Sequence, residues 1–149
     1  MSTVDERTAI GTLFNAGWDS DTTPIAWPNR NFTPPQNDSW VRLSILQGEP
    51  FQIEIGSANC NQHRSPGFVM ISVFSPMNKG DAAALALAET AAQIFRSTKR
   101  VSAGANGDIR FRTPEVKAIG IDSKGSRDLD EGTYYQVNVS VPFVRDDVF

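Results

Sequence analysis

The stretch Gly67-Phe68-Val69-Met70-Ile71-Ser72-Val73-Phe74-Ser75 decides the fold, because it is almost continuously apolar. A half-buried strand alternates apolar with polar residues, whereas this stretch has apolar side chains on both faces. We therefore predict a central strand that is covered on both faces. Burying each large side chain contributes about 1.5–3 kcal/mol, so the layers above and below this strand matter strongly for stability.

Shorter strands with a clean alternation are predicted around it. Trp40–Leu46 and Phe51–Ile55 each place apolar residues on one side, and the turn Gln47–Pro50 between them predicts a hairpin. Asp108–Arg112 and Tyr134–Val144 alternate in the same way. These segments give about five strands in total.

Two helices are predicted from apolar residues at helical spacing. Residues 4–18 place Ile10, Phe14 and Trp18 on one face. A second helix over about Gly80–Ser97 has a wide alanine stripe that lets its backbone lie close to a sheet. The order α-β-β-β-α-β-β predicts an α+β fold, with a mostly antiparallel sheet of about five strands and two helices on one face.

Three segments are predicted to lie outside these elements. Residues 19–39 contain four prolines and are expected to form an extended arm. Residues 115–132 are polar and glycine-containing, and they indicate a mobile loop. Residues 145–149 are expected to be a frayed tail that includes Asp146 and Asp147. The chain, residues 1–149, is otherwise predicted to be a single domain.

Composition narrows the class of protein. The formal net charge is −3, which argues against tight binding to nucleic-acid phosphates but is compatible with DNA sliding past. The single cysteine excludes an internal disulfide and suits a reducing cytoplasm. We find no signal-peptide pattern at the N-terminus and no apolar run of about 20 residues, so we expect a soluble protein with no membrane contact.

Residues able to support catalysis or bind a metal are sparse. Cys60 and His63 have a spacing seen in metal sites, but zinc normally needs four ligands, and we favour a structural loop. The acidic residues Asp128, Asp130 and Glu131 are interpreted as a solvated loop rather than a Mg²⁺ site. No phosphate-binding glycine motif is present. We therefore expect no catalytic residues, no cofactor and no metal.

Two sets of residues are candidates for protein contacts. Trp27 and Phe32 lie beside prolines, and such aromatic residues either pack into their own core or anchor in a neighbour's pocket. The sequence leaves both alternatives open. A basic set is interpreted as an ordinary charged face in preference to a patch for an acidic partner. It comprises Arg96, Lys99, Arg100, Arg110 and Arg112.

The order of these elements resembles the tail terminator-like proteins of long-tailed bacteriophages. The matching segments are, in order, IAWPNRNFTPP, DSWVRLSIL, HRSPGFVMISVFSP, GDAAALALAETAAQIFRST, RVSAG and TYYQVNVSVPF. The resemblance extends from about the first helix to Phe143. It depends on the succession of elements and on no single motif.

The resemblance implies a non-enzymatic structural protein of the virion, at the head-proximal end of the tail. Proteins of this type form a ring, usually a hexamer, that caps the tail tube, ends tube polymerisation and joins the neck or head; DNA passes through the channel. The expected partners are other copies of the chain, the major tail tube protein and a neck or head-completion protein. Expected contact residues are Trp27, Asn29, Arg30, Phe32, His63, Arg64, Arg110 and Arg112.

The numbers of predicted helices and strands point in the same direction. Two helices cover only one face of a five-stranded sheet, whereas Gly67–Ser75 has large apolar groups on both faces. The arm covers part of the second face in this interpretation, and a neighbouring subunit covers the rest. A head-to-tail contact repeated by rotation closes into a ring.

The sequence is also compatible with two alternative functions. A neck or head-completion (connector) protein, or a relative of the tail tube protein, has a similar small α+β domain. A small hydrolase belongs to a different class and requires a nucleophile paired with a base, for which His63 is the last candidate.

Overall fold

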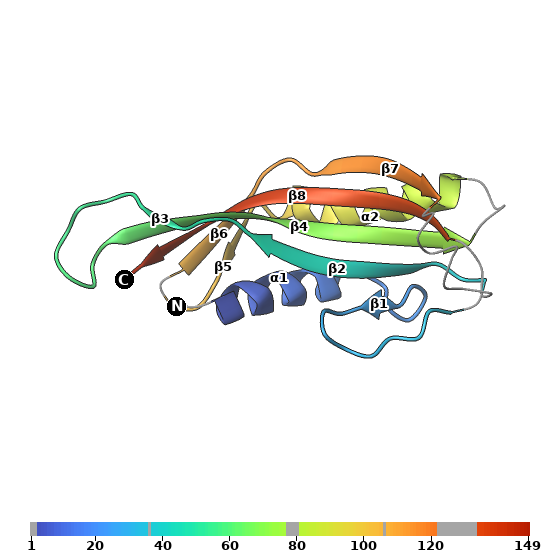
Figure 1. Cartoon of the computed structure of the whole chain (residues 1–149), viewed down its shortest axis with the longest axis horizontal. Helices are drawn as coiled ribbons and strands as arrows, with labels where there is room; N and C mark the ends of the chain where they lie inside the picture. Colours follow the sequence, from blue (N-terminus) through green and yellow to red (C-terminus); the bar gives the residue numbers. More distant parts are fainter. Residues whose placement is uncertain (1–2, 36, 77–80, 106, 122–133) are drawn as a thin grey trace.

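A single sheet with two helices is formed by the residues that the computed structural model describes, which are 3–35, 37–76, 81–105, 107–121 and 134–149 (Figure 1). The elements are α1 (Thr3–Gly17), β1 (Ile25–Ala26), β2 (Trp40–Gln47), β3 (Phe51–Gln52), β4 (Gln62–Pro76), α2 (Ala82–Ser97), β5 (Arg100–Ser102), β6 (Gly107–Phe111), β7 (Glu115–Ile121) and β8 (Tyr134–Val148). Over these described residues the fold is α+β as predicted, but the sheet has eight strands instead of about five. It is mixed, because β1 runs parallel to β2.

The long strands β4 and β8 form the centre of the sheet. Each has 15 residues, and they pair antiparallel from Gln62↔Val148 to Pro76↔Tyr134. At about 3.3 Å per residue this ribbon is roughly 50 Å long. The central position predicted for Gly67–Ser75 is confirmed within β4, but the strand begins five residues earlier, at Gln62. The predicted cover of both faces is incomplete, because Phe68 is 41% exposed.

Shorter strands lie end to end along both edges of this ribbon. On one edge, β2 pairs with residues 67–74 of β4, and β3 pairs with residues 63–64 of the same strand. The predicted hairpin between β2 and β3 is therefore wrong, because β4 is long enough to hold both strands one after the other. Gly48 marks the junction, where its amide donates to the carbonyl of Pro66 at 2.7 Å. Along β8, β7 and β6 follow one another, and β5 pairs with β6.

Both helices lie on one face of the sheet, as predicted. Phe14 of α1 stacks on Phe95 of α2 with ring centroids 6.3 Å apart, and Phe95 contacts Phe111 of β6 at 5.1 Å. The predicted alanine stripe of α2 is buried in the core. Its buried members are Ala84, Ala88, Ala91 and Ala92.

Two predicted irregular segments are strands where the structure describes them. Residues 115–121 form β7 and pair with β8, so the mobile-loop prediction is wrong there; the remaining residues of that prediction, 122–132, lie outside the described part. The predicted tail is also wrong, because β8 continues to Val148. Asp146 and Asp147 are buried instead of frayed. Arg64 of β4 pairs with the carboxylate of Asp146, and Arg145 of β8 itself pairs with that of Asp147.

The proline-rich arm packs against its own domain. At its start, Trp18 donates its indole N–H to the carbonyl of Thr23 at 3.0 Å. At its end, Phe32 contacts Trp40 at 5.1 Å between ring centroids, and the hydroxyl of Tyr134 donates to the carbonyl of Pro35 at 2.8 Å. The arm is thereby fixed against β2 and the end of the central ribbon.

Gly67 is expected to be intolerant of any side chain. An added Cβ would lie 2.6 Å from the carbonyl oxygen of Leu46 and 2.8 Å from the ring of Phe143. We predict that Gly67→Ala lowers the free energy of unfolding by about 1–3 kcal/mol, measured by urea denaturation at fixed protein concentration. As a control, Gly11→Ala places a Cβ 3.6 Å from Trp27 in a helix interior, and should stabilise by about 0.5–1 kcal/mol. A Gly67→Ala protein as stable as the parent would contradict this packing.

Candidate protein-interaction site

The sheet face opposite the helices, here called the outer face, is only partly covered. Near the arm it is closed, because Phe74 stacks on Trp40 at 4.2 Å and is only 6% exposed. Farther along the ribbon, Leu46 and its register partner Phe68 are 48% and 41% exposed. Phe51 of β3 is 51% exposed. The arm therefore shields one end of the outer face and leaves apolar side chains uncovered beyond it.

An arginine cluster, defined as Arg64, Arg100, Arg110 and Arg112, lies beside these apolar side chains. Arg64 makes two hydrogen bonds to Asp146, 2.8 Å and 3.0 Å long, and Arg110 pairs with the same carboxylate. Arg100 pairs with Asp108 at 2.7 Å. Arg64, Arg110 and Arg112 also line one surface hollow. The structure thus brings together three residues that the sequence analysis named as contacts, Arg64, Arg110 and Arg112.

Asp146 is held in its ionised form at the centre of this cluster. The hydrogen bonds from Arg64 are the main cause that lowers its pKa below the ordinary value, and Arg110 adds to the shift, while burial opposes it. Hydrogen bonding to Asp146 raises the pKa of Arg64 in turn. Three of the four arginines pair with two aspartates here, so the surface has an excess of positive charge in a chain whose net charge is −3.

His63 lies apart from Arg64, although the two residues are adjacent in sequence. Successive side chains of a strand point to opposite faces. The imidazole of His63 stacks on Phe149 with centroids 3.9 Å apart, and its Nδ1 lies 3.1 Å from the carbonyl oxygen of Asn61.

Among the described residues, no group of three or more His, Cys, Asp or Glu side chains is placed to hold a metal ion. Nor is any helix in those residues long and apolar enough to span a membrane.

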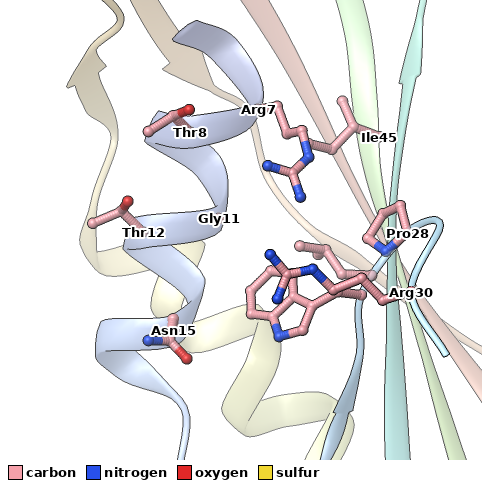
Figure 2. Close-up of a pocket in the computed structure, with 10 residues that line it drawn as sticks. Arg7, Thr8, Gly11, Thr12, Asn15, Pro28, Arg30 and Ile45 are labelled. Atoms are coloured by element: carbon pink, nitrogen blue, oxygen red, sulfur yellow. The ribbon is translucent and has the colours of Figure 1, made fainter. Parts of the chain in front are cut away.

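The arm, α1 and β2 line an open pocket of about 310 Å³, here called the arm cavity. Its lining includes Trp27, Leu43 and Ile45, together with Arg7 of α1 and Arg30 of the arm. Figure 2 shows the side chains of Arg7 and Arg30 converging on the cavity from its two sides. Neither arginine has an ion-pair partner within the described ranges. The arrangement suits a carboxylate next to an apolar group.

The arm residues named from the sequence therefore have different surroundings. Trp27 and Phe32 are half-buried against their own domain, whereas Asn29 and Arg30 are exposed. Asn29 has a φ of 54°, a left-handed conformation that asparagine tolerates better than most residues. Sequence reasoning missed Arg7. An arginine in the first turns of a helix is usually a solvated surface residue, so its position gave no functional signal.

A buried charge network was also missed by sequence reasoning. Glu6 of α1 is fully buried and contacts Arg145 at 3.2 Å, and Arg145 contacts Asp147 at 2.8 Å. Gln47 donates to the Glu6 carboxylate at 2.9 Å. The network ties α1 to β8 and β2. Removing one member of such a buried group leaves an unpaired charge, which is strongly destabilising.

The Asp146 pairing has a testable dependence on pH. Asp146→Asn removes the charge that Arg64 and Arg110 share, and we expect it to lower the free energy of unfolding by about 1–3 kcal/mol at neutral pH. The folded-state pKa of Asp146 lies below the unfolded-state value, so its contribution is complete above about pH 4–5 and is lost as the pH falls through the folded-state pKa.

Urea denaturation of both proteins across this pH range measures that dependence. The difference between parent and Asp146→Asn should shrink progressively on acidification. The exposed Glu49→Gln serves as the control and should match the parent at neutral pH. A difference that stays constant down to about pH 2 would show that ionised Asp146 is not the stabilising form.

Comparisons with known proteins agree with the architecture. One solved protein structure, whose name says nothing of its function, superposes on this chain with a TM-score of 0.63 and 20% sequence identity. The superposition covers 100% of this chain and 97% of that chain. This similarity concerns the fold alone. No curated protein sequence matches the chain. A family profile described as phage tail terminator protein matches residues 7–143, the same stretch over which the order of elements shows the resemblance. The chain therefore belongs to the phage tail terminator protein family.

Proposed function

We propose that this phage tail protein forms a ring, with six copies expected, that caps the tail tube, ends tube polymerisation and provides the joint to the neck or head. Membership in the tail terminator family supports a structural role in the virion tail. The ring, the capping step and the head-proximal position are the proposal's own additions. No cofactor takes part in this function.

The partly open outer face is the observation that carries the proposal. Leu46, Phe68 and Phe51 are each about half exposed, and the arginine cluster lies beside them. Exposed apolar side chains that gather next to charged groups are typical of a protein-binding surface. Two helices pack on one side of the sheet, and the arm shields one end of the other side. Sister copies of the chain are the partners proposed for the remainder.

Capping follows from the difference between the two ends of such a ring. The tube-facing end complements the last ring of the tail tube, whereas the far end has another surface and recruits no further tube protein. A heterologous contact repeated by rotation closes the ring, so growth also stops laterally. The net charge of −3 suits a channel through which DNA passes without binding.

Virus particles made without this protein test the capping step. We predict tails that are much longer than normal and lack heads, because nothing ends tube growth. Electron microscopy of tail lengths is the measurement. Tails of normal length alongside separate filled heads would indicate a neck or head-completion protein and would contradict the proposal.

Variants of the outer face test its role in assembly. Phe68→Gln combined with Leu46→Gln should change the free energy of unfolding by less than about 1 kcal/mol, because both side chains are already about half exposed. The same variant should shift the mass measured by light scattering, alone and with tail tubes, from the oligomer towards the monomer. Val4→Gln, an exposed position on α1, is the matched control and should assemble normally. An unchanged oligomer in the double variant would argue against the outer face as the contact.

A further inference from the structure

The segment between β3 and β4, residues 53–61 and here called the tip, extends past α1 at one end of the molecule (Figure 1). Hydrogen bonds give it a defined shape. The amide N–H of Ile53 donates to the carbonyl oxygen of Gln62, at the start of β4, at 2.9 Å, and the amide N–H of Gly56 donates to Oδ1 of Asn61 at 2.6 Å. Ile55 is fully exposed, and the preceding carboxylate, Glu54, is exposed as well. The tip thus presents an apolar side chain beside a negative charge.

The arm cavity has the complementary chemistry. Its apolar lining, Trp27, Leu43 and Ile45, suits a branched aliphatic side chain, and Arg7 and Arg30 provide two guanidinium groups for a carboxylate (Figure 2). At about 310 Å³ it lies at the lower end of the roughly 300–1,000 Å³ that is usual for ligand pockets. A volume of this size suits one or two side chains of a partner better than a cofactor.

We propose that the tip of one copy inserts into the arm cavity of the next copy in the ring. Ile55 packs against Trp27 and Ile45, and the carboxylate of Glu54 pairs with Arg7 and Arg30. This inference rests on the proposed function, because it supplies the repeated contact that a ring requires. The tip lies at one end of the ribbon and the cavity lies between α1, the arm and β2, so the two surfaces differ and the contact is heterologous.

A mixing experiment uses this asymmetry. The tip variant is Glu54→Gln with Ile55→Ser, and the cavity variant is Gly11→Leu, which fills the space beside Trp27. Each variant alone should lose the oligomer, with at least a tenfold weaker association measured by light scattering and sedimentation. An equimolar mixture retains one intact tip and one intact cavity per pair, so it should form 1:1 dimers and no rings.

Matched controls separate assembly from folding. Gly11→Ala adds one methyl group at ordinary contact distance from Trp27, and Ser57→Ala changes the tip away from Ile55; both should assemble like the parent. Urea denaturation and circular dichroism should show that the tip variant and the cavity variant fold normally. If Gly11→Leu is unstable, Arg7→Gln with Arg30→Gln replaces it as the cavity variant.

The outcomes distinguish this inference from the proposed function. Rings that form normally in both variants would overturn the tip contact and leave the capping function standing. Normal rings in the cavity variant that no longer bind tail tubes would assign the cavity to an acidic segment of the tube protein, and would also overturn the inference. A parent protein that stays monomeric both alone and with tail tubes would contradict the ring itself.

Covalent trapping provides an independent readout. In a Cys60→Ser background, which removes the exposed native thiol, one protein has Ile55→Cys and another has Arg30→Cys. Mixed and mildly oxidised, they should give a disulfide-linked dimer, since a disulfide requires Cα atoms about 4.4–6.8 Å apart. Ile55→Cys mixed with Thr90→Cys, on the exposed face of α2, should give none. Equal cross-linking in both mixtures would overturn the contact.

Discussion

The antiparallel pairing of β4 with β8 is the constraint on which the rest of the structure depends. Each strand has 15 residues, and α1 and α2 have 15 and 16. A strand rises about 3.3 Å per residue whereas a helix rises about 1.5 Å, so helices of equal residue count cover roughly half of the ribbon's length. Toward the N-terminal end of α1 the apolar core gives way to the buried Glu6–Arg145–Asp147 network. Beyond this network the sheet continues into the projecting tip.

The same constraint explains why the candidate contacts lie where they do. The arm closes the outer face only at the end where Trp40, Phe74 and Tyr134 gather. The arginine cluster and the exposed apolar residues occupy the other half of the ribbon. The tip and the arm cavity lie on separate surfaces, which is the arrangement that a head-to-tail assembly uses. The fold thus keeps the surfaces for its proposed neighbours distinct from the sealed core.

Local patterns in the sequence predicted where helices and strands form better than they predicted which strands pair with one another. The apolar stretch Gly67–Ser75 and the alanine stripe identified β4 and α2, because periodicity reports burial directly. The polar extension of β4 from Gln62 gave no such signal, since its stability comes from pairing with β8 and β3. Asp146 was likewise predicted to lie in a solvated end of the chain. Its partner Arg64 is 82 residues away, so no local pattern indicates their pairing. The juxtaposition of Arg7 with Arg30 in the arm cavity also depends on tertiary packing, so no local pattern reveals it.

We propose that other copies at the end of the tail cover the surfaces left open on one copy. An electron cryomicroscopy map of the head-proximal tail end tests it most directly. We predict a closed ring of this chain above the last tube ring, with the outer face turned towards protein and each tip seated against the neighbouring arm. A single copy per tail, or a ring whose outer faces and tips all point into solvent, would contradict it.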